Sequence, residues 1–407
     1  MPSQTAAYPR KPVDYWLFGG ALCLLVIGLL MVLDSSYIEQ LDRGNHDAFF
    51  QLKRQLGGAF MGIAALAAVW AYGYWRLSRL AVPLMIFGLV LLVAVYFPPF
   101  KHVEKGAARW IKVGFMFQPS EVAKLFLLIY VAKLLSRPVP KSFNSLSALV
   151  NWVGAPLLIT VFYIGLIDKE PDLGTAAVLF LAVLTQLYLA GVKKRHLLMI
   201  VGAAAIVGIF TIISHKHRIG RMTTFLNPES DQQGAGFQTI QSTRAVGSGS
   251  WFGMGWGHGR GKYYLPETDS DFIFATIAEE LGFVGVLPII GLFMLIAYRG
   301  FMIAFQTKDR FASILAGGIT SLFSFQALIN IATATGSLPA TGVPLPLISS
   351  GNSSLISTLI GIGILMSVSQ HPTPPGQPVS TGEEKPTLRL KSTIEHAATK
   401  RGRATAN

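Results

Sequence analysis

Three carboxylates, at Glu267, Asp269 and Asp271, lie within five residues of one another, directly before an apolar run that starts at Phe272. This spacing places Asp271 at the mouth of the structure that the apolar run builds. Burial and neighbouring acids raise the pKa of a carboxylate, whereas the N-terminus of a helix lowers it. A carboxylate with a raised pKa can act as a general base toward a sugar hydroxyl. The alternative is structural, because Ser270 or Asp271 could cap the helix that follows.

Two further acids, Glu279 and Glu280, lie within the same apolar run. Ionisable side chains inside an apolar helix are costly and are usually functional or paired. Consecutive residues point in different directions on a helix, so we expect one of the two to face a cavity. A buried ion pair with an arginine or a lysine is the alternative.

Basic residues that could bind a phosphate lie between residues 98 and 124. Arg109 is followed by Trp110 and Lys112, and a planar guanidinium beside an amphipathic ring suits the phosphate of a lipid carrier. The alternative is an interfacial belt of tryptophan and lysine. Lys124 lies three residues after Glu121, so these two side chains could instead bind each other.

Polar residues also mark two other junctions with apolar runs. Asp172 follows Pro171 where a helix is expected to begin, so it could bind substrate or cap that helix. The segment 336–354 combines glycines and prolines with Ser349 and Ser353, and backbone N–H groups at a helix start bind anions. A rigid, proline-rich re-entrant segment is the alternative there.

Several other classes of site find no support in the sequence. No G-x-x-x-x-G-K-[ST] motif is present, so a P-loop energy source is excluded. The glycines from Gly253 to Gly259 lack a βαβ context and do not form a dinucleotide fingerprint. The single cysteine, Cys23, lies in an apolar run, and only His215 and His217 have the spacing of metal ligands. We therefore predict no metal site from ligand motifs.

The elements that must position these residues are membrane helices. Of the 407 residues, 51% are hydrophobic and only 14% are charged, and the mean hydropathy is +0.49. A soluble protein of this length carries about 25% charged residues. A helix needs roughly 20 mostly apolar residues to cross a bilayer. Ten runs approach this length, at 16–33, 56–72, 80–97, 119–135, 149–167, 173–190, 197–213, 272–298, 311–335 and 353–369.

Charge predicts how these runs are oriented. The net charge of +13 falls mainly in short connectors and in the tail, which indicates topology and not nucleic-acid binding. Lysine and arginine follow the even-numbered runs and flank both ends, so the positive-inside rule makes these segments cytoplasmic. We predict an all-α integral membrane protein, with a bundle of ten transmembrane helices (16–370), a cytoplasmic N-terminus (1–15) and a disordered cytoplasmic tail (371–407).

The opposite, extracytoplasmic face is predicted to carry four loops, at 34–55, 98–118, 214–271 and 336–352. The loop 214–271, between helices 7 and 8, is the longest, and loops of this length are usually functional or disordered. Its aromatic residues indicate that it folds back on the bundle.

The motifs in this order resemble those of the SEDS family, which comprises FtsW, RodA and SpoVE. The similarity covers roughly residues 12–370. The matching elements include R-W at 109–110, P-D-L-G-T at 171–175, R-I-G-R at 218–221, A-V-G-S-G at 245–249, D-F-I-F at 271–274 and E-E-L-G at 279–282. The segment 262–267, which leads into the acidic cluster, is more similar to FtsW or SpoVE than to RodA.

This resemblance implies a peptidoglycan glycosyltransferase of the bacterial cytoplasmic membrane. Such an enzyme polymerises lipid II into glycan strands and releases undecaprenyl pyrophosphate, in cell division or in cell-shape maintenance. The resemblance also implies a class B penicillin-binding protein, a transpeptidase, as partner. The aspartate of the family's D-F-I-F element falls on Asp271, and the tryptophan of its R-W element falls on Trp110.

The sequence departs from the family pattern at three places. Asp269-Ser270 replaces the usual H-T, Ser350-Gly351-Asn352 replaces the usual Y-G-G, and Glu170 replaces the glutamine of Q-P-D. The added acids could alter the pKa of the base or recruit a divalent cation, Mg²⁺ or Mn²⁺.

We therefore expect Asp271 to be the catalytic base, in an extracytoplasmic active site that binds two lipid-linked substrates. The expected substrate-binding residues are Arg109, Trp110, Lys112, Lys124, Asp172, Arg218, Arg221, Gln238, Arg244, Glu267, Glu279, Ser349 and Ser353. Two other functions fit a bundle with polar outer loops. One is a flippase for lipid II, and the other is a non-catalytic scaffold for a class B penicillin-binding protein.

Overall fold

A computed structural model describes residues 11–42, 47, 49–97, 101–104, 107–113, 115–138, 146–231, 234–265 and 267–371. The described residues belong to one compact unit. The predicted tail, 371–407, lies outside the described residues except for His371, and so does most of the predicted N-terminal segment. Their disorder and their location stay predictions.

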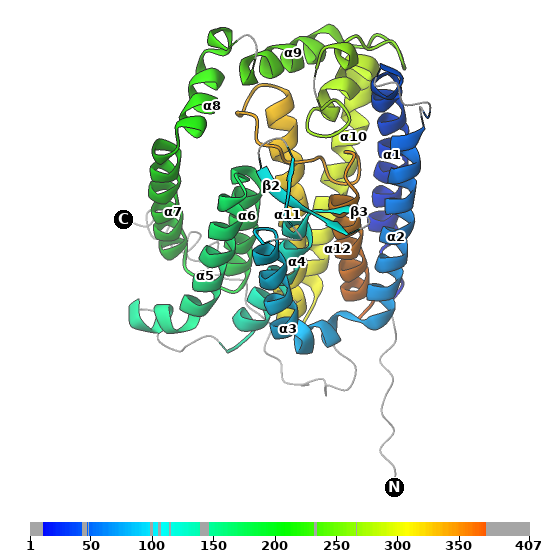
Figure 1. The fold of residues 1–407 in the computed structure, drawn as a ribbon. Helices are drawn as coiled ribbons and strands as arrows, with labels where there is room; N and C mark the ends of the chain where they lie inside the picture. The colour runs from blue at the N-terminus through cyan, green and yellow to red at the C-terminus, as the bar shows by residue number, and fades with distance from the viewer. Residues whose placement is uncertain are drawn as a thin grey trace, which may run out of the picture. The chain divides into compact units, whose positions relative to one another are not determined.

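The described part of the chain is mostly helical, which confirms the predicted fold class. The long helices are α1 (Tyr15–Asp42), α2 (Phe50–Tyr72), α3 (Tyr74–Ala94), α4 (Pro119–Leu135), α5 (Leu146–Lys169), α6 (Leu173–Leu189), α7 (Lys194–Ser214), α10 (Ile273–Gln306), α11 (Arg310–Ala334) and α12 (Asn352–Gln370). Each of the ten predicted apolar runs lies on one of these helices (Figure 1).

The length of each apolar helix bears on how many of them span the membrane. In the described residues, eight helices are long and apolar enough to cross a membrane. The other two, α4 and α6, have 17 residues each. A helix of this length extends about 26 Å, somewhat less than the ~30 Å hydrocarbon core of a bilayer. The count of ten therefore stays a prediction.

Small residues bring the helices of the bundle close together. On α2, a Cβ at Gly62 would collide with Leu359 of α12. On α12, a Cβ at Gly363 would lie 2.7 Å from the backbone oxygen of Leu66 on α2. Helices in a membrane associate by such close packing, since lipid tails are as apolar as their side chains. The α2–α12 pair is thereby fixed in register, which matters because both helices begin beside the site.

Two connections that were predicted as irregular loops contain regular structure. The described residues of the segment 101–117 form an antiparallel sheet in the order β1 (Lys101–Glu104), β2 (Ala107–Val113) and β3 (Phe115–Phe117). The loop 214–271 contains α8 (Lys216–Leu226), η1 (Pro228–Ser230), α9 (Ala235–Ser248) and η2 (Gly261–Tyr263). Figure 1 shows α8 and α9 at one end of the bundle, and α9 packs on α10 and α11. We call the end where α2, α10 and α12 begin the site end.

Glycines let the long loop approach the backbone of α10 directly. Helix α10 is broken at Gly282, where φ is 65° and ψ is −173°. A Cβ at Gly282 would collide with the backbone of Gly253, and one at Gly253 would collide with the carbonyl oxygen of Glu280. Both residues have positive φ, which glycine adopts without strain. The glycine-rich segment 253–259 is therefore a packing element.

Candidate active site

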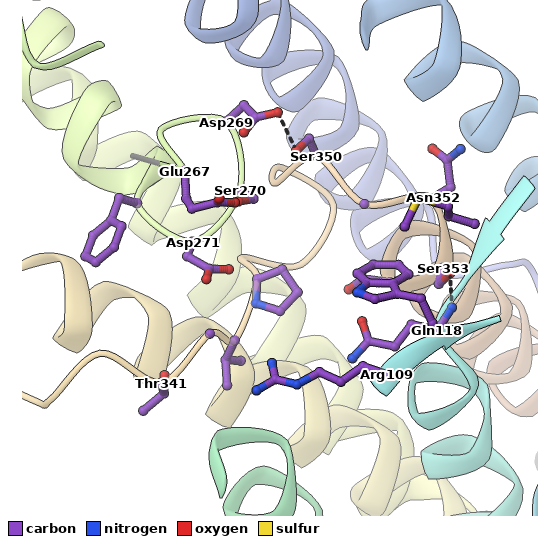
Figure 2. Close-up of a pocket in the computed structure, with 18 of the residues that line it drawn as sticks. Arg109, Gln118, Glu267, Asp269, Ser270, Asp271, Thr341, Ser350, Asn352 and Ser353 are labelled. Atoms are coloured by element: carbon purple, nitrogen blue, oxygen red, sulfur yellow. Dashed lines mark hydrogen bonds between the residues drawn. The ribbon is translucent and has the colours of Figure 1, made fainter. Parts of the chain in front are cut away.

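A cavity of about 480 Å³ opens among the loops and helix starts at the site end. Its walls come from α2, β2, α8, α9, the segment 267–272, the segment 340–344 and the start of α12. Figure 2 shows that segments far apart in the sequence converge on it. Among the charged side chains on its walls are three acids and three arginines, namely Glu267, Asp269, Asp271, Arg54, Arg109 and Arg221. The lining of the cavity is therefore polar, although the cavity lies at the end of an apolar bundle.

Asp271 lies on the wall of this cavity, immediately before α10. Phe272 occupies the N-cap position of α10 and makes no side-chain capping bond, so neither Ser270 nor Asp271 occupies the position that the capping alternative assigned to it. Asn330 on α11 donates from Nδ2 to the backbone oxygen of Asp271 at 2.9 Å and to that of Val343 at 2.8 Å. This amide joins the two segments that flank the cavity. The backbone of Asp271 is thus fixed beside the segment 340–344, and its side chain lies on the cavity wall.

Arg109 faces Asp271 across Gly342. Its Nε donates to the carbonyl oxygen of Glu170 and its Nη2 to that of Pro171, both at 2.6 Å. A Cβ at Gly342 would lie 3.8 Å from Nη1 of Arg109 and 3.7 Å from Oδ2 of Asp271. Gly342 has a φ of 74°, so a residue without a side chain suits both the turn and the open space. Figure 2 shows both side chains directed into the cavity.

The turn between α5 and α6 holds two buried acids beneath Arg109. Glu170 is 0% exposed, and neither of its carboxylate oxygens has a hydrogen-bond partner. Burial, then the charge of Asp172, raise the pKa of Glu170 to about 9, although Arg109 opposes this shift. Asp172 caps α6 by accepting from the backbone N–H of Thr175 at 3.0 Å, as the structural alternative predicted. Burial raises the pKa of Asp172 as well.

Other side chains that were predicted to bind substrate lie around Asp271 and Arg109. Arg221 on α8 and Gln238 on α9 line the cavity, as does Trp110 on β2. Arg218 is buried and forms a salt bridge with Asp168 at 2.8 Å, which fixes α8 to the end of α5.

The three clustered acids have different surroundings. Glu267 has a positive φ of 60°, a strained conformation of the kind that collects at functional sites, and its Oε2 accepts from Ser270 Oγ at 2.9 Å. Asp269 Oδ2 accepts from Gln51 Nε2 at 3.1 Å and from Ser350 Oγ at 2.8 Å. Two of the departures from the family pattern, at 269 and 350, therefore bind each other. Asp269 holds the site together, while Asp271 faces the open space.

Some predicted substrate-binding residues do not line the cavity. Lys124 is buried in a pair with Glu121 at 2.8 Å, the alternative that their spacing suggested. Ser349 is buried and donates to the backbone oxygen of Ser270 at 2.6 Å. Lys112 and Arg244 are exposed elsewhere, on β2 and α9 respectively.

Glu279 and Glu280 hold the long loop and do not face the cavity. Glu279 accepts from the backbone N–H groups of Arg260 and Gly261 at 3.0 and 2.9 Å. Glu280 pairs with Lys262 at 3.0 Å, and Lys262 also pairs with Asp34 on α1 at 3.1 Å. The expectation that one of the two glutamates faces a cavity is not met, and the buried ion pair predicted as the alternative is present.

Sequence reasoning missed one wall of the site. Gln51, Arg54 and Gln55 on α2 line the cavity. Ser353, a predicted residue, lines it too and accepts from the backbone N–H of Gln118 at 2.9 Å. A spacing of three and four residues is the signal that could have placed the α2 residues on one face. The signal is weak because Lys53 and Arg54, at the start of an apolar run, are more simply explained as interfacial residues.

A divalent cation has limited support from the donor set. Among the described residues, no group of three histidine, cysteine or acidic side chains is placed to hold a metal ion. Oδ2 of Asp269, the nearest added acid, already accepts two hydrogen bonds from the protein. A cation requirement stays a prediction, and the chemistry proposed for the site uses only side chains of this chain.

The fold and the site define a class: a polytopic helical membrane protein with a polar, acid–arginine cavity at one end of its bundle. The chain belongs to the FtsW, RodA and SpoVE family, whose model, described as "Cell cycle protein", matches residues 15–373.

The relatives agree with the predicted preference for FtsW and SpoVE. Stage V sporulation protein E of Bacillus subtilis is 41% identical over 355 residues, which cover 86% of this chain and 95% of that protein. A probable peptidoglycan glycosyltransferase FtsW of Trichlorobacter lovleyi is 36% identical, over 88% of this chain and 95% of its own length.

Solved structures support the same fold. A chain described in work on the structural coordination of polymerization and crosslinking by a peptidoglycan synthase complex has a TM-score of 0.73 and 30% identity, over 88% of this chain and 98% of its own. The rod shape determining protein RodA of Thermus thermophilus has a TM-score of 0.64 and 27% identity, over 93% and 100%.

Proposed function

We propose that this protein is a peptidoglycan glycosyltransferase that polymerises lipid II at the outer face of the cytoplasmic membrane. The observation that carries this proposal is the placement of Asp271 opposite Arg109, on either side of Gly342, within one polar cavity. Its relatives named as probable peptidoglycan glycosyltransferases, at 36% identity and above, support it.

The reaction needs a base and a site for a leaving anion. The 4-hydroxyl of the acceptor disaccharide gives its proton to the Asp271 carboxylate as its oxygen attacks the anomeric carbon of the donor. A new carbon–oxygen bond forms there, the bond to the lipid pyrophosphate breaks, and its electron pair leaves with the pyrophosphate. Arg109 and Arg221 stabilise that developing charge, as fixed cations do in a partly dehydrated site.

We propose a transpeptidase partner as well, and the same comparison supports it. The structural relative at 30% identity comes from a complex that coordinates polymerization with crosslinking. A class B penicillin-binding protein would crosslink the strands that this chain makes. The flippase and scaffold alternatives share the membrane bundle but do not need a base opposite an arginine.

The test is polymerisation of lipid II by the purified protein, with and without a class B partner and with a transpeptidase inhibitor. We expect a ladder of glycan strands on a gel that is lost in Asp271→Asn, which keeps the shape of the side chain and removes its basicity. Glu229→Gln, a matched change at an exposed acid of the same long loop, should keep the ladder. A ladder made by Asp271→Asn would contradict the assignment of the base, and no ladder from the wild type would favour a flippase or a scaffold.

A further inference from the structure

Arg54 is a cation on the cavity wall that the chemistry described so far does not use. It lies on the first turns of α2 and lines the cavity, and its side chain is exposed. Within the described residues, no carboxylate forms an ion pair with it. An arginine in a partly enclosed cavity is a preferred partner for phosphate, because its planar fork donates two parallel hydrogen bonds.

The neighbours of Arg54 on the same helix face are fixed by protein contacts. Gln51 donates to Asp269, as described, and Gln55 donates to the carbonyl oxygen of Ser349 at 3.1 Å. Gln55 also accepts from the backbone N–H of Gly351 at 3.2 Å. These bonds attach α2 to both loops that flank Asp271. Arg54, between the two glutamines, is therefore held at the cavity wall by the contacts of its neighbours.

The wall that carries Arg54 is separate from the wall that carries Arg109. Helix α2 packs on α12 and α1, whereas Arg109 is bound to the α5–α6 turn. Arg221 belongs to the side of Arg109, since its Nη1 donates to the backbone oxygen of Ala340 at 3.5 Å, on the segment that carries Gly342. The cavity therefore has cations on more than one wall, and Asp271 and Arg109 both lie close to Gly342.

The proposed reaction brings two pyrophosphates to this site, and they must lie at different distances from the base. The donor carries its pyrophosphate on the carbon that is attacked, next to the hydroxyl that Asp271 deprotonates. The acceptor carries its pyrophosphate at the far end of the disaccharide whose hydroxyl reacts. Cations at two separate places would suit the two pyrophosphates.

We propose that Arg54 binds the pyrophosphate of the acceptor lipid-linked saccharide, while Arg109 and Arg221 bind that of the donor. This assignment rests on the proposed glycosyltransferase function and gives it two distinct anion subsites. It makes Arg54 a binding residue for one substrate only.

The test separates the two substrates by chemistry. A lipid II analogue whose 4-hydroxyl is blocked can only donate, so it is coupled to unmodified lipid II under single-turnover conditions in vesicles. Varying lipid II at saturating analogue gives the KM for the acceptor, and varying the analogue gives the KM for the donor. We expect Arg54→Ala to raise the acceptor KM roughly tenfold to a hundredfold, the effect of losing a charge-assisted bond, and to leave the donor KM unchanged.

The control is the adjacent cation. Lys53 has a side chain that is 68% exposed and pairs with Asp47 at 2.8 Å, so Lys53→Ala removes an equal charge without touching the cavity. It should leave both KM values unchanged. Arg54→Lys, which keeps the charge but not the fork, should fall between the wild type and Arg54→Ala.

Four results would overturn the assignment. Equal KM values for Arg54→Ala and wild type, or a rise in the donor KM alone, would remove Arg54 from the acceptor subsite. An effect that appears only when the vesicles contain anionic phospholipid would show that Arg54 binds a bilayer headgroup. If the wild type forms no product, the glycosyltransferase proposal fails and this assignment fails with it.

Discussion

At the scale of single residues, Glu170 shows how the environment of an acid decides its charge. It is fully buried without a hydrogen-bond donor, and burial followed by the charge of Asp172 raises its pKa to about 9. The carboxyl is therefore protonated in the folded protein at neutral pH, whereas in the unfolded chain it ionises near its ordinary pKa of 4.5. A protonated glutamic acid is close in shape and charge to glutamine, the residue that the family pattern places there.

We predict that Glu170→Gln stabilises the protein at neutral pH. Between about pH 4.5 and 9, the folded state binds a proton that the unfolded chain has lost, so stability falls as pH rises through this window. Replacing the acid removes that penalty, which is roughly 3 kcal/mol at pH 7. Thermal unfolding in detergent should show a higher Tm for the variant at pH 7 and equal Tm values near pH 4.

The exposed Glu229→Gln variant is the control and should melt like the wild type at both pH values. If Glu170→Gln melts at the same temperature as the wild type at pH 7, Glu170 is ionised in the folded state.

The residues that sequence reasoning placed correctly in the cavity have strong local signals. Asp271 and Glu267 belong to an acidic cluster before an apolar run, and Arg109-Trp110 belongs to a basic connector. Arg54 and Asn330 have no such signal. Their positions depend on which helix packs on which, and that is set by long-range contacts that a single sequence does not reveal.

At the scale of elements, the long loop is attached to the bundle by a buried charge network. Lys262 joins Glu280 on α10 to Asp34 on α1, and side-chain exposure is 2% for the lysine, 0% for the glutamate and 8% for the aspartate. Removing one member of a buried network leaves the others without a counter-charge. The network and the Gly253–Gly282 contact together determine where the segment 253–265 lies, and this segment leads directly into the acidic cluster.

We predict that Lys262→Met destabilises the protein by about 3 kcal/mol or more and weakens polymerisation, because Asp34 and Glu280 lose their counter-charge. Hydrogen exchange should show faster opening of 253–265 than in the wild type. Arg260→Met, at an exposed residue of the same segment, should change neither exchange nor activity. Unchanged exchange in Lys262→Met would mean that the glycine contacts alone hold the loop.

The elements that sequence reasoning missed are those without a clear periodic signal. The segment 101–117 was expected to be a loop, but β2 pairs with β1 through residues 107–111 and with β3 through residues 111–113. Helix α3 begins at Tyr74, six residues before the predicted start, because Arg76 and Arg79 are polar and yet helical. Polar residues indicate where a segment leaves the membrane. They do not by themselves indicate whether that segment is a helix or a loop.

At the scale of the whole molecule, the alternation of apolar runs was enough to predict the bundle. Runs of about 20 apolar residues have one stable form in lipid, the helix, because every backbone hydrogen bond is then made within the run. The order in which the helices pack could not be predicted, because apolar faces of similar composition do not specify their partners.

The orientation of the bundle is open to a direct test. We predict that both ends of the chain are cytoplasmic and that the site end is extracytoplasmic, because the basic connectors lie at the opposite end. In a Cys23→Ser background, a membrane-impermeant maleimide should label Glu229→Cys in intact cells. It should label Lys194→Cys only after the membrane is permeabilised. The reverse pattern would place the site in the cytoplasm.

Helix α7 buries only His196 and Leu197 against the rest of the described protein. Its 21 residues extend about 32 Å, close to the thickness of the hydrocarbon core. Because so few of its residues are buried against the protein, we expect the thickness of the bilayer to influence the tilt of α7. Only His215 separates α7 from α8, so a change in tilt would reach Arg218 and Arg221. The enzyme should therefore respond to membrane thickness: its rate in vesicles should pass through a maximum as the lipid acyl chains are lengthened.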